Sequence, residues 1–135
     1  MIDHLGFYVR DAAKSLAFYS AALAPLGIEV VEEQPWFNAR IYMRRGGVTF
    51  LWLGEADRSN PRIANPGVSP VHIGFSAASL GEVDAFYAAA IAAGGRDNGP
   101  PHYARPDCYH AFVFDPGDPR YLRRPTTAST AAWTL

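Results

Sequence analysis

Few side chains in this sequence could bind a metal ion or move a proton. They are four histidines, one cysteine and 13 acidic residues. Neutral imidazole is the commonest metal ligand in proteins, and it titrates near physiological pH. The histidines are His4, His72, His102 and His110. Which chemistry each can support depends on the elements that position it.

His4 and His72 occupy matching places in an internal repeat with an offset of 68 residues. From His4 to Gly27, ten of 24 positions are identical to their counterparts in the second copy, against roughly two expected by chance. The matches include His, Gly, Phe and a Phe-Tyr pair, which alanine richness does not produce. The chain therefore contains two copies of one supersecondary unit.

Each copy of the repeat is predicted to form a βαβββ unit. A short β-prone segment leads through a polar stretch into an amphipathic helix, and strands follow. Asp11 and Ser79 are predicted to cap the helices at their N-termini, and glycines at 27 and 94–95 to end them. The predicted helices are 12–24 and 80–93, and the predicted strands are 4–9, 28–32, 39–44, 48–53, 71–75, about 95–98, 108–114 and one after 118.

The predicted fold class is α+β, with two paired βαβββ modules forming a curved mixed sheet around a pocket. A four-stranded sheet with one helix cannot cover both of its faces, whereas two copies can enclose a pocket. At 135 residues we expect a single domain. Its parts are module one at about 1–56, a linker at about 54–70, module two at about 71–122 and an irregular tail at about 117–135.

Composition and charge exclude several classes of protein. With 49% hydrophobic and 19% charged residues, the chain can form a core and is not disordered. A net charge of -1 without an arginine stripe argues against a nucleic-acid partner. No apolar run reaches the roughly 18 residues of a membrane span, and no signal peptide is evident. The single Cys108 cannot form an internal disulfide, so we expect an inert thiol in a reducing cytoplasm.

Three motifs resemble those of the vicinal oxygen chelate superfamily, which contains glyoxalases, bleomycin-resistance proteins and extradiol dioxygenases. They are DHLGFYVRD at 3–11, VHIGF at 71–75 and AFVFDP at 111–116. The resemblance covers about residues 2–116 and implies paired βαβββ modules, with a divalent metal ion between them in the metal-dependent members. In those members the first strand of each module supplies a histidine, which assigns the metal-ligand role to His4 and His72. Imidazole suits Zn, Ni, Fe or Mn.

The carboxylate ligand that this resemblance implies is missing from its place. Relatives carry a glutamate on the last strand, and counting from Asp115 puts that place at or next to Leu122. Glyoxalase-type relatives also carry a glutamate on the fourth strand of module one, where the nearest acid is Glu55. The substitute ligands that remain are His110, Glu55 and Asp118.

Four residues are candidates for the lining of a pocket. His110 is in phase with two phenylalanines on its predicted strand, and His102 lies in a predicted loop at 100–106 near the pocket mouth. Trp52 and Tyr109 are aromatic residues on predicted strands that could face a ligand. The alternative for each is structural: a sheet-edge or loop histidine, or an aromatic residue in the core.

Two functions fit these observations. The first is a glyoxalase- or dioxygenase-like metalloprotein, in which a divalent metal (Zn, Ni, Fe or Mn) chelates adjacent oxygens of a small molecule and acts as a Lewis acid. The alternative is a bleomycin-resistance-like protein that binds a small molecule without catalysis and has a degenerate metal site. We expect a homodimer in either case, because an irregular last strand leaves a sheet edge open to pairing.

Overall fold

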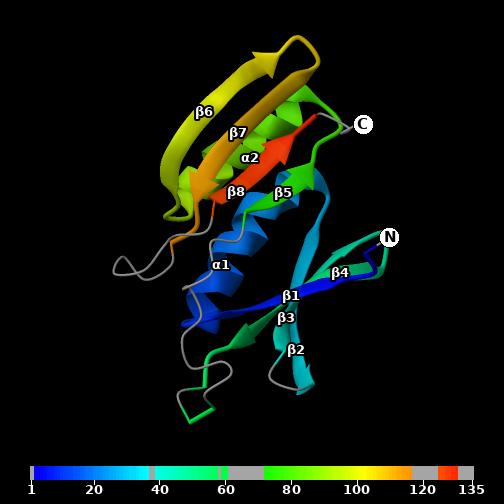
Figure 1. Cartoon of the computed structure of the whole chain (residues 1–135), viewed down its shortest axis with the longest axis vertical. Coiled ribbons are helices and arrows are strands. Elements are labelled where there is room, and N and C mark those ends of the chain that lie inside the picture. The colour runs from blue at the N-terminus through cyan, green and yellow to red at the C-terminus, as the bar shows by residue number, and fades with distance from the viewer. Residues whose placement is uncertain (1, 37–38, 58, 61–71, 117–124, 131–135) are drawn as a thin grey trace.

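The computed structural model describes the chain except for residues 1, 37–38, 58, 61–71, 117–124 and 131–135. Two four-stranded mixed sheets and two α-helices make up the described part (Figure 1). The α+β class and the pair of βαβββ units are therefore confirmed. None of the described helices is long and apolar enough to cross a membrane.

The first module has the strand order β1-β4-β3-β2, in which β1 and β4 are parallel. Its elements are β1 (Leu5–Val9), α1 (Ala12–Leu23), the 3-10 turn η1 (Ala24–Leu26), β2 (Glu29–Trp36), β3 (Ala39–Arg45) and β4 (Val48–Glu55). The Asp11 side chain accepts a hydrogen bond from the backbone N–H of Lys14, so it caps α1 as predicted. Gly46 and Gly47, both with positive φ, form the tight turn between β3 and β4.

The second module repeats this arrangement with the order β5-β8-β7-β6. Its elements are β5 (Ile73–Ser76), α2 (Leu80–Ala92), β6 (Arg96–Arg105), β7 (Cys108–Phe114) and β8 (Pro125–Ser129). The edge strand β5 pairs in parallel with β8, as β1 pairs with β4. Ser79 caps α2 by accepting from the backbone N–H of Glu82, as predicted.

Two strands of the second module differ from the sequence prediction. β6 runs to Arg105, so His102 lies on a strand and not in a loop. The prolines at 100 and 101 argue against a strand, but β6 is an edge strand with register shifts, where proline is tolerated. The final strand predicted after residue 118 is present as β8, but it lies within the segment that was predicted to be an irregular tail. Its sequence PTTAS lacks apolar alternation, and it is held as a strand by pairing with β5 on one side and β7 on the other.

The apolar core lies between each sheet and its helix, and α1 contacts α2. Phe18, Tyr19 and Phe86 are fully buried there. The Tyr19 hydroxyl donates to Oδ2 of Asp115 at 3.0 Å, which joins α1 to the residue that follows β7. Because the helices and the core occupy one face of each sheet, the other faces are free to form a binding site.

Candidate functional site

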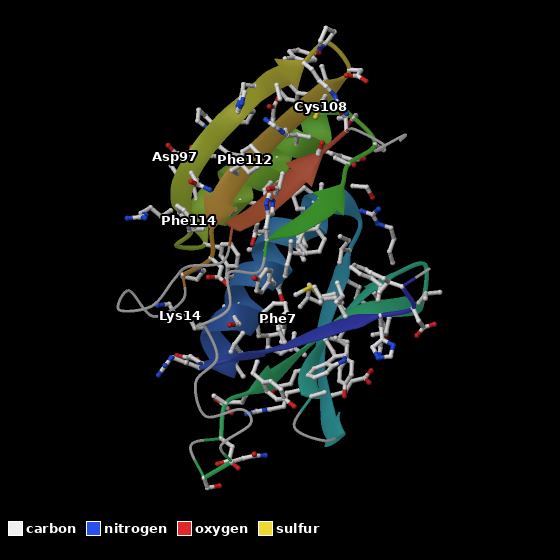
Figure 2. All side chains as sticks on the ribbon, in the orientation of Figure 1. Phe7, Lys14, Asp97, Cys108, Phe112 and Phe114 are labelled. Atoms are coloured by element: carbon white, nitrogen blue, oxygen red, sulfur yellow. The ribbon has the colours of Figure 1, made fainter. Side chains whose placement is uncertain are left out.

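A cavity of about 690 Å³ lies over the strands of the second sheet. Side chains alternate along β7, so Ala111 and Val113 pack into the core while His110 and Phe112 line the cavity. Figure 2 shows Cys108 near one end of β7 and Phe112 further along it. The cavity volume is typical of small-molecule sites in proteins. Its lining includes His72, Cys108, His110, Phe112, Thr127 and Ser129.

His72 directly precedes β5, and its ring faces the neighbouring strand. Its Nε2 atom lies 2.6 Å from Oγ1 of Thr127 in β8. Gly74 pairs with Thr127 across the parallel ladder, just as Gly6 pairs with Trp52 in the first module. The repeat thus makes Trp52 and Thr127 equivalent, and neither side chain is a carboxylate. Thr127 therefore lies beside His72. The predicted ligand position at or next to Leu122 lies outside the described residues.

His4 is not part of the cavity lining. It precedes β1 at the edge of the first sheet, and its side chain is 57% exposed. Its Nδ1 atom lies 2.7 Å from Oδ1 of Asp3, which is itself almost fully exposed. The resemblance implies that His4 and His72 share one metal ion. In the structure each has its own partner, Asp3 for His4 and Thr127 for His72.

Trp52 covers the free face of the first sheet. Its indole ring lies over Gly6, where an added Cβ would collide with the ring. The ring packs edge-on against Tyr8, with centroids 5.7 Å apart. At the equivalent position of the second sheet, nothing lies within 4 Å of a Cβ built on Gly74. Trp52 thus occupies the space over Gly6 on the first sheet, whereas the equivalent space over Gly74 on the second sheet is empty.

Glu55 is engaged at the end of β4. Its Oε2 atom accepts a hydrogen bond from Nη1 of Arg40 at 2.6 Å. Its Oε1 atom faces the backbone N–H of Ala12, the first residue of α1, at 3.5 Å. Both contacts hold the carboxylate between its own sheet and the start of α1, and Glu55 is absent from the cavity lining.

Tyr109 points away from the cavity, contrary to the expectation that it lines a pocket. Its hydroxyl donates to Oδ1 of Asp84 on α2 at 2.8 Å. The alternation of β7 explains the difference, because Cys108 and His110 on either side of Tyr109 face the cavity. The bond to Asp84, together with burial and the Asp84 charge, raises the pKa of Tyr109.

His102 and His110 form a pair across β6 and β7. They are opposite each other in the ladder, and their Nε2 atoms are 3.1 Å apart. Nδ1 of His102 lies 2.7 Å from the carbonyl oxygen of Pro100. A carbonyl only accepts, so Nδ1 carries the ring proton and Nε2 of neutral His102 has a lone pair. His110 therefore donates from Nε2, and its Nδ1 faces the Cys108 sulfur at 3.9 Å.

No group of three or more His, Cys, Asp or Glu side chains in the described ranges is arranged to hold a metal ion. The substitute ligand Asp118 lies outside those ranges. Sequence reasoning missed Thr127 and Ser129 as lining residues. No signal was available for them, because β8 (PTTAS) shares no identity with FLWLG, the part of β4 at the equivalent register.

The comparisons with known proteins agree with this architecture. The family model of the glyoxalase/bleomycin resistance protein/dioxygenase superfamily matches residues 1–118. A glyoxalase/bleomycin resistance protein from Albidiferax ferrireducens is similar in structure, with 29% identity, 94% of this chain and 95% of that chain covered, and a TM-score of 0.72. None of the curated proteins compared with the chain matches it in sequence.

Two more distant structures show the same fold. A glyoxalase/bleomycin resistance protein/dioxygenase family enzyme from Burkholderia phytofirmans has 19% identity, coverage of 95% and 96%, and a TM-score of 0.69. The fosfomycin resistance protein FosX from Mesorhizobium loti has 14% identity, coverage of 98% and 93%, and a TM-score of 0.63. At these identities the likeness establishes the fold alone.

Proposed function

The chain belongs to the glyoxalase/bleomycin resistance protein/dioxygenase superfamily, and from that premise we propose that it binds a small organic molecule in the cavity over its second sheet. The observation that carries this proposal is the mixed lining of the cavity. Phe112 supplies an aromatic surface, and the hydroxyls of Thr127 and Ser129 supply hydrogen bonds. Arg105, which is paired with Asp107 at 3.0 Å, also contributes to the lining. This combination suits an aromatic ring that bears an acidic or hydroxyl group.

The residues at the metal position of the superfamily do not fit a metal ion. Thr127 and Trp52 occupy the equivalent places on β8 and β4, and neither can act as an anionic ligand. His72 is bonded to Thr127, and His4 to Asp3. The proposed function therefore uses no metal at this position. Of the two predicted functions, we favour the binding of a small molecule without catalysis.

The assignment of His4 and His72 as metal ligands stays a prediction. Elemental analysis of the wild type beside the His4→Ala/His72→Ala double variant tests it, after reconstitution with Zn, Ni, Fe and Mn. If His4 and His72 bind no metal, as proposed here, the wild type and the double variant should hold the same amount of metal. A metal that is lost only from the double variant would contradict the proposal and restore the metalloprotein function.

A homodimer in the cytoplasm is the state we propose for this protein. The free faces of the two sheets support a dimer, because one presents Trp52 and the other an open cavity. A single buried thiol, Cys108, suits a reducing compartment. Light scattering on the eluting protein should give a mass of about twice the 14.7 kDa of one chain. A mass of one chain at all concentrations would contradict the dimer.

The binding proposal can be tested with an aromatic anion whose fluorescence increases on binding, 8-anilinonaphthalene-1-sulfonate. Gly74→Leu fills the open space beside Thr127, so we expect it to weaken binding at least about tenfold, the usual effect of losing 1.4 kcal/mol. Gly81→Leu makes the same change on the exposed side of α2 and should bind like the wild type. Equal binding by both variants, with unchanged near-ultraviolet dichroism, would refute a site in this cavity.

A further inference from the structure

The pair His102 and His110 has the geometry of a metal chelate. Their Nε2 atoms are 3.1 Å apart. With metal–nitrogen bonds of about 2.05 Å, this separation corresponds to a nitrogen–metal–nitrogen angle of about 100°. That value lies between the angles of an octahedral and a tetrahedral site. One ion can therefore bind both nitrogens without movement of the two strands that carry them.

The ring of His102 is held in the tautomer that a metal ion requires. Its Nδ1–H donates to the carbonyl oxygen of Pro100 at 2.7 Å, which leaves the lone pair of Nε2 directed at His110. Histidines that bind metals through one nitrogen usually donate the other N–H to a carbonyl or carboxylate, which fixes the ring. Pro100 supplies that second contact here, from the same strand.

The ring of His110 is held from the other side. Its centroid is 4.4 Å from that of Phe112, and its Nδ1 faces the Cys108 sulfur. Burial and the neighbouring His102 lower the pKa of His110. His110 also lines the cavity, so an ion bound by this pair would lie at the rim of the cavity.

We propose that His102 and His110 bind a late first-row divalent metal ion, such as Zn2+, Ni2+ or Cu2+. Imidazole pairs favour these ions over Mn2+ and Mg2+. The ion displaces the proton that the two Nε2 atoms share and binds both nitrogens from beside the line that joins them, and His110 then carries that proton on Nδ1, toward Cys108. Water or a donor atom of a cavity ligand fills the remaining coordination positions. The site differs from the superfamily position at His4 and His72, and goes beyond the small-molecule binding proposed above.

The four histidines allow a test that identifies the ligands by residue. The Cε1–H proton signals can be assigned in nuclear magnetic resonance spectra with the single variants His4→Gln, His72→Gln, His102→Gln and His110→Gln. A small amount of paramagnetic Ni2+ should broaden the His102 and His110 signals first. In calorimetric titrations with Zn2+, His102→Gln and His110→Gln should each lose at least about tenfold in affinity, the effect of disturbing even the outer contacts of a metal site. His4→Gln and His72→Gln are the matched controls and should bind as the wild type does.

Three results would overturn the proposal. They are the absence of broadening at His102 and His110, preferential broadening at His4 or His72, and equal loss of Zn2+ affinity in all four variants. His102 is exposed, so His102→Gln should fold even if His110→Gln does not. The broadening itself is measured on wild-type protein, and the His110 signal can be assigned by elimination from the other three variants. The test is independent of the cavity proposal, because neither Ni2+ nor Zn2+ binding requires the fluorescent anion.

Discussion

The Nε2 atom of His72 lies 2.6 Å from the Oγ1 atom of Thr127, across the parallel pair β5 and β8. This contact joins the start of the second module to β8, the last of the described strands. It also places a hydroxyl beside His72, at the position equivalent to Trp52 in the first module. The hydrogen bond engages the Nε2 atom of His72, and its contribution to stability can be measured.

Thr127→Val should destabilise the fold by about 1 kcal/mol, because His72 loses its hydroxyl partner at nearly constant volume. Thr126→Val is a control on the neighbouring residue. The Thr126 hydroxyl is buried and makes no hydrogen bond to any described residue, so its removal should be neutral or stabilising. Urea denaturation of the two variants measures the difference. Equal destabilisation by both would show that the His72–Thr127 bond has no special role.

Gly6 and Gly74 should respond differently to substitution by alanine, although they are equivalent in the repeat. Gly6→Ala forces a Cβ into the indole ring of Trp52, which should cost about 1–3 kcal/mol through overpacking. Gly74→Ala meets open space and should be tolerated. Thermal unfolding with tryptophan fluorescence measures both effects, since displacement of Trp52 changes its emission. Similar unfolding temperatures and unchanged emission in Gly6→Ala would contradict this packing.

The repeat explains why the fold could be predicted from the sequence. Helices with clear caps at Asp11 and Ser79, and the strand at 108–114, carry strong local signals, and the structure has them where they were predicted. β8 and the second half of β6 carry no such signal. Polar PTTAS and a Pro-Pro sequence become strands because neighbouring strands pair with them. Tertiary pairing here outweighs local preference.

The candidate site was predictable only in part, for the same reason. His72 and His110 could be named from the repeat and from the phase of their strands, and both line the cavity. Thr127 could not, because its place depends on the register of a strand that the sequence does not reveal. Tyr109, a candidate for the pocket lining, instead contacts Asp84 on α2. Neighbouring residues on a strand face opposite sides of the sheet. An error of one residue therefore exchanges a cavity residue for one that contacts a helix.

Tyr109→Phe should reduce stability at neutral pH by removing the hydrogen bond to Asp84. The pKa of Tyr109 is raised in the folded protein, mainly by this bond. The stabilising effect is therefore complete below the ordinary tyrosine pKa of about 10 and is lost as the pH rises through the higher folded value. The gap in urea midpoint between wild type and variant should shrink above about pH 10. Tyr103→Phe, at an exposed neighbour, should show no such gap at any pH.

Tyr19→Phe should weaken both modules together. The Tyr19 hydroxyl on α1 donates to the buried carboxylate of Asp115, 96 residues away in the second module. Loss of a hydrogen bond to a carboxylate should cost about 1.5–3 kcal/mol. Tyr42→Phe removes a bond to the carbonyl oxygen of Ala39, within one strand of the first module, and serves as the local control.

Amide hydrogen exchange distinguishes a shared contact from a local one. If the bond joins the modules, Tyr19→Phe should lower the protection of amides in α1 and in β7 by similar factors, because both belong to one cooperative unit. Tyr42→Phe should change protection in the first module only. Faster exchange confined to α1 in Tyr19→Phe would contradict this coupling. The two copies of the repeat would then unfold independently, with the helix–helix contact too weak to join them.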